Sequence, residues 1–356
     1  MAQGIRVGVI GATGLVGTQM LRLLEERSFP VSELVPFASE RSRGRELPFA
    51  GGVVACRVLE DGCFDGLDLV IVDVDDPIAL EWAPQAAAAG AKVVDNSAAF
   101  HMDPDVPLVV AEVNPEDLTE LPHGIAACPN CTTMVLLTAI APLHRAAGIN
   151  RMVISTYQSV SGAGQPGMRE LESQWRALAN DLPSLATAGQ HPEMLSPGEV
   201  WDRPIAGNVI PLAGSRKESG YTSEEWKLVY ESRKILHAPE LRATATCVRV
   251  PVLVGHAMTA NIQFADSMTA EVAAELLQNA PGVTLVEGGA GAPTALEGAG
   301  IDPVLVGRIR NDPSQANTLD LWVTGDNIRK GAALNAVQIA ECLINRKLIS
   351  AKKKAA

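Results

Sequence analysis

A short β-rich segment followed at once by three glycines constrains the fold of this chain more than any other feature. The segment IRVGVI, residues 5–10, leads into GATGLVG, in which Gly11, Gly14 and Gly17 have the spacing of a dinucleotide-binding turn. An amphipathic helix is expected over residues 15–27. Glycines let the backbone approach a pyrophosphate, and the helix amino terminus offers free N–H groups. The pattern predicts a Rossmann-like nucleotide-binding domain; the alternative is a plain strand-to-helix turn.

Short apolar segments and helical segments alternate through the first part of the chain. The apolar runs are nearly continuous, which is typical of parallel strands covered on both faces. Strands are expected over residues 69–74, 92–95, 108–113 and 124–128, and a helix over residues 78–89. This βαβ rhythm predicts a doubly wound α/β domain.

The pattern changes after Gly148. Longer strands with polar alternation, together with two helices, predict a second, α+β domain with a mostly antiparallel sheet. The strands are expected over residues 151–160, 243–254, 256–265, 304–310 and 317–325, and the helices over residues 168–179 and 223–236. A last amphipathic helix, residues 330–346, is expected to pack back onto the first domain. The predicted domains are therefore residues 1–130 with 330–348, and residues 131–329.

Composition excludes several classes of protein. A formal net charge of -12 argues against a nucleic-acid partner, and the lysines at 352–354 are expected to be a solvated tail. No apolar run approaches the roughly 20 residues that span a bilayer, and the chain enters its first strand without a signal peptide. Six scattered cysteines suit a reducing compartment. We expect a cytoplasmic protein with free thiols and no membrane partner.

The segment after the second strand favours one form of the cofactor. That strand should end near Phe37, where an NAD enzyme usually places an acid on the ribose 2′-hydroxyl. The chain instead offers Ser39, Arg41, Ser42 and Arg43, with Glu40 as the one nearby acid. Hydroxyl and guanidinium groups suit a 2′-phosphate, so NADP is predicted. An exposed basic loop is the alternative.

Cys131 in the segment PNCTT is the candidate nucleophile. It stands where a helix should open, with Asn130 as a possible N-cap. The helix dipole and free N–H groups there stabilise a thiolate and can hold an oxyanion. A buried, inert cysteine is the alternative. Cys128 also gives a CxxC spacing, which leaves a redox pair open; zinc would need further ligands, and no metal is expected.

Nearly the whole chain resembles the aspartate-semialdehyde dehydrogenase family. The resemblance rests on GATGLVG, FASERSRGREL, VVDNSAAFHMDPDVPLVV, PNCTT, QSVSGAG, GNVIP, EEWKLVYESRKIL, CVRVPVLVGHA and LWVTGDNIRKGAALNAVQIAE. It implies a Rossmann-like cofactor domain joined to a catalytic and dimerisation domain. It also implies a homodimer or homotetramer and a role in lysine, methionine and threonine biosynthesis.

The resemblance assigns roles to matching positions. Cys131 would be acylated by aspartyl-β-phosphate with release of phosphate, and NADPH would reduce the thioester to aspartate β-semialdehyde. His256 would act as general acid/base and Gln158 would orient the substrate. The remaining implied contacts are Glu225 with the substrate ammonium, Arg249 with its α-carboxylate, Lys227, Asn130 and His101 with substrate or phosphate, and Thr13, Leu15, Val16 and Asn327 with the cofactor.

Departures from the family pattern cluster on the cofactor and phosphate side. His101 stands where the family usually has a phosphate-binding Arg, and Ala111 replaces a residue that is often Pro or Ser. Asp73, Asp75 and Asp76 replace a Ser-Ala-Gly turn, and carboxylates beside a pyrophosphate are unfavourable unless they point away or bind a ribose hydroxyl. These departures suggest a specialised paralogue with a weakened phosphate site.

Three further alternatives stay open at this point. The PNCTT context argues against N-acetyl-glutamyl-phosphate reductase, whose cysteine lies in a Gly-Cys-Tyr setting. A glyceraldehyde-phosphate dehydrogenase has no place for EEWK or QSVSGAG. The joint presence of Cys131, Gln158, Glu225, Arg249 and His256 argues against a non-catalytic dinucleotide-binding protein.

Overall fold

The computed structural model describes residues 4–179, 182–183, 185, 197–287 and 291–349. The chain divides into two compact units. Unit 1 comprises Met1–Leu137, Lys234–Ala238 and Arg329–Ala356, and unit 2 comprises Thr138–Arg233 and Pro239–Ile328. The solvated tail expected at residues 352–354 lies outside the described residues.

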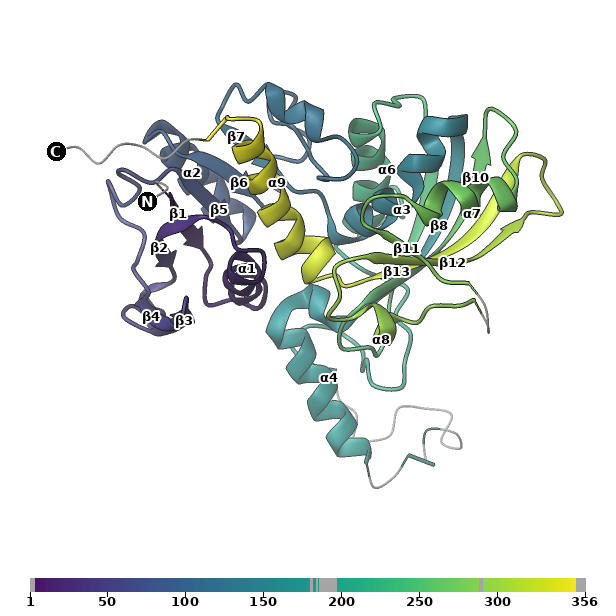
Figure 1. The fold of residues 1–356 in the computed structure, drawn as a ribbon. Helices are drawn as coiled ribbons and strands as arrows, with labels where there is room; N and C mark the ends of the chain where they lie inside the picture. The colour runs from purple at the N-terminus through teal and green to yellow at the C-terminus, as the bar shows by residue number, and fades with distance from the viewer. Residues whose placement is uncertain (1–3, 180–181, 184, 186–196, 288–290, 350–356) are drawn as a thin grey trace. The chain divides into compact units, whose positions relative to one another are not determined.

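Unit 1 is built on a parallel five-stranded sheet with strand order β2-β1-β5-β6-β7 (Figure 1). The strands are β1 Ile5–Ile10, β2 Val31–Phe37, β5 Leu69–Val72, β6 Lys92–Asp95 and β7 Ile125–Ala127. Every residue of β5 is buried, as expected for a strand covered on both faces. The expected parallel nucleotide-binding sheet is confirmed.

Helices α1, α2, α3 and α9 contribute to unit 1. Helix α1 (Leu15–Glu26) packs against α9 (Leu334–Asn345), and α2 (Asp76–Ala88) packs against β5 and β6. Helix α3 (Cys131–Ala147) begins in unit 1 and continues into unit 2. Just before α9, residues Arg329–Ala333 form a π-helical turn, η4, where the sequence predicts an ordinary helix start. Such turns are rare and occur often at functional sites.

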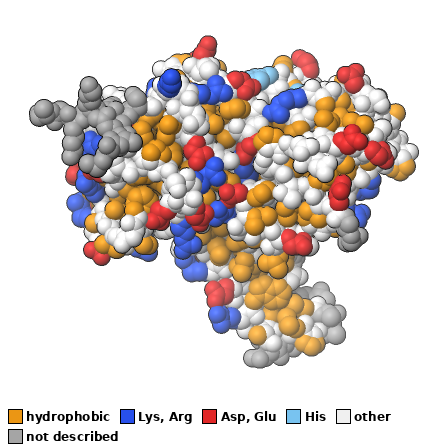
Figure 2. Space-filling view, in the orientation of Figure 1, with side chains coloured by type: hydrophobic (Ala, Val, Ile, Leu, Met, Phe, Trp, Pro, Cys, Tyr) orange, Lys and Arg blue, Asp and Glu red, His pale blue; other side chains and the backbone are white. Residues whose placement is uncertain are grey.

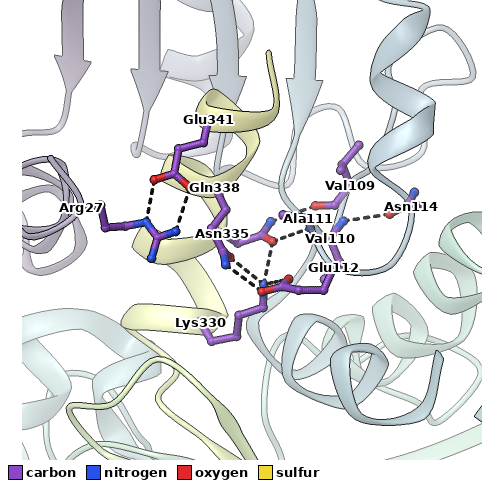
Figure 3. Close-up of polar contacts among 10 residues, drawn as sticks. All are labelled: Arg27, Val109, Val110, Ala111, Glu112, Asn114, Lys330, Asn335, Gln338 and Glu341. Carbon is purple, nitrogen blue, oxygen red and sulfur yellow. Dashed lines mark hydrogen bonds and ion pairs between the residues drawn. The ribbon is translucent and has the colours of Figure 1, made fainter. Parts of the chain in front are cut away.

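Residues 108–113 form only a single parallel bridge, from Leu108 to Ala127 of β7, in place of the predicted strand. The side chain of Asn114 bonds to the backbone of this segment. Its Oδ1 accepts from Val110 N at 3.0 Å, and its Nδ2 donates to Leu108 O at 2.9 Å. Asn335 of α9 accepts from Ala111 N at 3.1 Å and donates to Val109 O at 2.8 Å (Figure 3). These amides satisfy the backbone groups that a neighbouring strand would otherwise pair, so the apolar run stays irregular although it is largely buried.

Unit 2 contains a six-stranded sheet with order β11-β12-β13-β10-β8-β9. Its strands are β8 Ile149–Gln158, β9 Arg242–Arg249, β10 His256–Phe264, β11 Val283–Leu285, β12 Val304–Asn311 and β13 Thr318–Gly325. The central pairs are antiparallel as expected, but the outer pairs β8–β9 and β11–β12 are parallel. The sheet is therefore mixed, because β9 and β11 reach their neighbours through crossover segments that contain α6 and α8.

The helices of unit 2 are α4 Gly164–Leu178, α6 Ser223–Ile235, α7 Ala270–Gln278 and α8 Ala295–Gly298. Helix α7 packs on β11 and β12, and α8 on β13. Unit 1 also contains a hairpin of β3 Glu46–Phe49 and β4 Gly52–Ala55 that was not expected from the sequence. Short 3-10 turns in the described part of the chain are η1 Glu40–Ser42, η2 Pro115–Thr119 and η3 Val160–Ala163.

Two surface features bear on partners. Among the described residues, no helix is both long and apolar enough to cross a membrane. Figure 2 shows acidic and basic side chains interspersed over the visible face, without a large field of one sign.

Candidate active site

In the glycine loop between β1 and α1, two of the three glycines lie so close to neighbouring backbone that a larger residue would not fit. Gly11 has φ +84°, and a Cβ there would lie 2.0 Å from Asp73 O. A Cβ on Gly17 would lie 2.2 Å from Gly11 O. The N–H of Gly11 donates to Phe37 O at 3.0 Å, which ties the loop to β2. Gly14 is less confined by the protein, and this suits a position reserved for close approach of a ligand.

The other expected loop residues surround the first turn of α1. Thr13, Leu15 and Val16 are partly exposed, and α1 begins at Leu15 with Gly14 as its N-cap and no side-chain cap. The first N–H groups of a twelve-residue helix are thus left without a capping side chain. A loop of small residues at such a helix end fits a pyrophosphate.

The acidic turn after β5 has its own protein partners. Asp73 accepts from Asn96 Nδ2 at 2.8 Å, and Asp76 accepts from Ala98 N at 2.9 Å. Burial raises the pKa of Asp73 to about 6, with the neighbouring Asp75 adding to the rise. Asp73 thus carries less charge in mildly acidic solution than an ordinary aspartate.

The loop after β2 leaves its hydroxyls and one arginine available while its acid is paired. Glu40 forms a two-point ion pair with Arg43, at 2.8 and 2.9 Å, and this pairing lowers the pKa of Glu40. Ser39 and Arg41 are exposed, and Ser42 is partly exposed. An acid engaged in this way competes less for a ribose 2′-hydroxyl, which fits the expectation of a 2′-phosphate.

Cys131 is the first residue of α3, a helix of 17 residues, and is partly exposed. Asn130 donates from Nδ2 to Thr132 Oγ1 at 2.7 Å, and its carbonyl accepts from Met134 N at 2.9 Å, so it organises the first turn. Cys128 differs sharply from Cys131. It is fully buried, and burial raises the pKa of its thiol to about 12. A thiol of that kind is a poor partner for a redox pair, so the geometry favours Cys131 as a single nucleophile.

Gly331, in the π-helical turn, lies against Cys131. A Cβ added to Gly331 would stand 3.0 Å from Cys131 Cβ and 3.4 Å from its Cα and O. Any side chain there would displace the candidate nucleophile. The sequence analysis missed this contact, although an isolated glycine inside a helical pattern is a signal of close packing.

His101 is a buried residue in a partly exposed loop of unit 1, and hydrogen bonds hold the backbone of that loop. Lys234 donates from Nζ to three carbonyls of that loop: His101 O at 2.9 Å, Asp103 O at 2.6 Å and Val106 O at 2.9 Å. His101 is 5% exposed. Its backbone is therefore held in place whatever its side chain binds.

In unit 2, Gln158 ends β8 and is fully buried. Its Nε2 donates to Glu224 Oε1 at 2.9 Å, and its Oε1 accepts from Thr156 Oγ1 at 3.1 Å. The other oxygen of Glu224 lies 4.0 Å from Lys227 Nζ. Gln158, Glu224 and Lys227 thus form one polar group at the start of α6.

Glu225, which is expected to bind a substrate ammonium, does not belong to that group and is engaged by the protein backbone. Its two carboxylate oxygens accept from the backbone N–H of Thr222 at 2.7 Å and of Cys247 at 3.0 Å. Thr222 Oγ1 in turn accepts from Glu225 N at 3.2 Å. This is a capping box, whose pattern Thr-x-x-Glu is visible in the sequence. The acid that faces Gln158 is Glu224, one residue earlier.

His256 and Arg249 meet the segment that follows β8. His256 is fully buried, and its Nδ1 accepts from Ser159 N at 3.1 Å. Burial, and then the charge of Arg249, lowers the pKa of His256 well below its ordinary value. Arg249 donates from Nη1 to Ser159 O at 2.6 Å. A Cβ on Gly162 would stand 2.7 Å from Arg249 Nη1 and 3.4 Å from His256 Cε1, so QSVSGAG needs its glycine there.

Asn327 supports the same group of residues. Its Oδ1 accepts from Ser159 Oγ at 2.9 Å and from Gly255 N at 2.9 Å, and its Nδ2 donates to Ser161 Oγ at 2.9 Å. Asn327 is 5% exposed. The residue expected to contact the cofactor therefore also joins the two segments that flank His256.

Comparison with known proteins identifies the family of this chain. Residues 6–121 match the family model for the semialdehyde dehydrogenase NAD binding domain, and residues 140–330 match that for the semialdehyde dehydrogenase dimerisation domain. An aspartate-semialdehyde dehydrogenase of Streptomyces akiyoshiensis is 49% identical over 339 residues, which cover 95% of this chain and 98% of that protein. The chain belongs to the aspartate-semialdehyde dehydrogenase family.

Solved structures of the same family agree with the fold. Aspartate semialdehyde dehydrogenase II from Vibrio cholerae, in a crystal structure complexed with ASA, is 42% identical with a TM-score of 0.90 and covers 97% of this chain and 99% of that chain. The resemblance drawn from the sequence motifs is confirmed, as is the assignment to an enzyme class. Similarity of this extent does not favour the non-catalytic or specialised-paralogue alternatives.

Proposed function

We propose that this chain is an NADP-dependent aspartate-semialdehyde dehydrogenase. It reduces aspartyl-β-phosphate to aspartate β-semialdehyde with release of phosphate, and catalyses the reverse phosphorylating oxidation, on the route to lysine, methionine and threonine. The observation that carries the proposal is full-length similarity to enzymes of that name, at 49% identity, in a chain whose candidate nucleophile opens α3.

Cys131 carries the acyl group in this reaction. Its thiolate attacks the acyl carbon, and phosphate leaves with the electron pair of the broken C–O bond, which gives a thioester. The nicotinamide cofactor, when bound, supplies the hydride. The resulting thiohemiacetal releases the aldehyde and regenerates the Cys131 thiolate. The N–H groups at the start of α3 suit both the thiolate and the developing oxyanion.

His256 is the hydrogen-bond donor to the substrate oxygen. Its lowered pKa keeps the imidazole neutral at physiological pH. Because Nδ1 accepts from Ser159 N, the proton of the neutral ring resides on Nε2. The Nε2–H group can therefore donate a hydrogen bond to the oxygen that becomes negative when hydride adds, and the alkoxide then collapses to the aldehyde as the Cys131 thiolate leaves, with no net proton transfer.

Substrate recognition falls to Arg249 and Glu224. Among the described residues the buried Nε of Arg249 has no protein partner, which leaves a donor for an α-carboxylate. Glu224, in place of Glu225, receives the substrate ammonium beside Gln158. Asn130 and Lys227 complete the contacts to substrate and phosphate.

His101 occupies the position that is expected to bind the substrate phosphate. His101 lacks the fork of an arginine, although its loop is held firmly by Lys234. We expect His101→Arg to lower the KM for phosphate in the oxidative direction. An unchanged KM would show that phosphate binding does not depend on this position.

The proposal also includes the form of the cofactor, the domain boundaries and the oligomeric state. Ser39, Arg41 and Ser42 favour NADP, with the Glu40 carboxylate engaged by Arg43. The cofactor domain is residues 1–130 with 330–348, and residues 131–329 form the catalytic domain. The enzyme works as a cytoplasmic homodimer.

The decisive test measures reduction of NADP and of NAD with aspartate semialdehyde, with and without phosphate. Wild-type protein should turn over with phosphate and NADP, and Cys131→Ser should not, whereas Cys128→Ser should keep most activity. Turnover by Cys131→Ser, or none by the wild type, would overturn the proposal.

A further inference from the structure

A buried charge lies next to the residue that touches Cys131. Lys330 immediately precedes Gly331 in the π-helical turn and is 0% exposed. Its ammonium donates to the Glu112 carboxylate, to Gln338 Oε1 at 2.9 Å and to Asn335 Oδ1 at 3.2 Å. Gln338 Nε2 also donates to Glu112 Oε1 at 2.8 Å. All three ammonium hydrogens therefore have acceptors (Figure 3).

This network joins three pieces of unit 1. Glu112 lies in the irregular segment 108–114, Lys330 lies in the π-helical turn, and Asn335 and Gln338 lie in α9. Burying an ammonium and a carboxylate is costly, and removing either partner is strongly destabilising. The turn is therefore held where the ammonium meets its three acceptors.

Gly331 is the residue of this turn that contacts the nucleophile, Cys131. The turn brings its Cα so close to Cys131 that a Cβ would stand 3.0 Å from Cys131 Cβ, and a methyl group fits there only if Cys131 shifts by a few tenths of an ångström. The backbone of Gly331 is not in the left-handed region, so its glycine is required by this contact and not by its φ.

We propose that Gly331 and the Lys330–Glu112 pair are positioning residues for Cys131. The ion pair fixes the position of the π-helical turn. The backbone of Gly331 in that turn then packs directly against Cys131. The inference rests on the proposed role of Cys131 and deepens it, because it names what determines the placement of the thiolate at the start of α3.

The first experiment adds one methyl group where Gly331 contacts Cys131. In Gly331→Ala, Cys131 must shift by a few tenths of an ångström; displacements of about 1 Å can cost about 100-fold, so we expect kcat to fall about tenfold. The KM for aspartate semialdehyde and the affinity for NADP should stay near wild type. The pH profile of Cys131 alkylation by iodoacetamide should move to higher pH, because the thiolate leaves its best position at the helix end.

Gly52→Ala is the matched control. It adds the same methyl group in unit 1, where the nearest atom, Phe49 O, would be 3.8 Å away. This variant should keep the wild-type kcat and alkylation profile. If Gly331→Ala behaves like Gly52→Ala while Cys131→Ser is inactive, the inference is wrong and the proposed function stands. If Cys131→Ser is active, the proposed function itself is wrong.

The second experiment removes the ion pair without leaving a charge unpaired. The double variant Lys330→Met with Glu112→Met should keep a thermal midpoint near wild type, because apolar pairs often replace buried ion pairs without loss. Its kcat should fall and its alkylation profile should shift as in Gly331→Ala. Glu341→Gln, which breaks the Arg27–Glu341 pair between α1 and α9, is the control and should leave both unchanged. A folded double variant with wild-type kcat and alkylation profile would contradict the role of the pair.

Discussion

Glu224 and Glu225 are neighbours in sequence but have different hydrogen-bond partners. Glu224→Gln should raise the KM for aspartate semialdehyde about tenfold or more with little change in stability, because it removes the charge beside Gln158. Glu225→Gln should cost about 1–2 kcal/mol of stability, because it weakens a capping box and a bond to β9, with a smaller effect on KM. Steady-state kinetics and urea denaturation of both variants check this; a reversed pattern would restore Glu225 as the substrate contact.

Asp73 links stability to pH. Its folded-state pKa of about 6 lies above the ordinary 3.8, so the folded protein binds a proton more tightly than the unfolded chain. Its stabilising contribution is complete below the unfolded value and is lost as pH rises through about 6. The buried charge then costs at most about 3 kcal/mol, at about 1.4 kcal/mol per pKa unit.

Asp73→Asn should therefore unfold at higher urea than wild type at about pH 7.5, and this gain should shrink by roughly half at about pH 5. Urea denaturation at both pH values is the measurement, and the exposed Asp61→Asn is the control. A gain that does not depend on pH would show that the pKa of Asp73 is not raised.

At the scale of elements, segment 108–114 depends on side chains from elsewhere for its backbone bonds. Asn335→Ala should destabilise the protein by about 2–4 kcal/mol, because Val109 O and Ala111 N lose their partners in a buried setting. Gln85→Ala, which removes an amide bond on the exposed face of α2, should cost less than about 0.5 kcal/mol. Thermal or urea unfolding distinguishes the two; equal effects would mean that the segment does not need Asn335.

At the scale of the whole molecule, the glycine loop and the loop after β2 predict a preference between cofactors that unfolding can measure. A ligand that binds the folded chain alone at about a hundred times its Kd stabilises by about 2.7 kcal/mol. NADP should raise the unfolding midpoint at concentrations where NAD does not, and Arg41→Ala should remove most of this difference. Equal protection by both would contradict the NADP assignment.

The sequence by itself determined the parallel nucleotide-binding sheet, the glycine loop, the helix that Cys131 opens and the family. These depend on local patterns: apolar runs, glycine spacing and helix-start residues carry their information within a few positions. Only the tertiary structure decided which glutamate faces Gln158, why residues 108–113 are not a strand, and what lies against Cys131. Those outcomes depend on contacts such as Asn335 with Val109 and Gly331 with Cys131, between residues some 200 positions apart. No local pattern records such contacts, because they form only when the chain has folded.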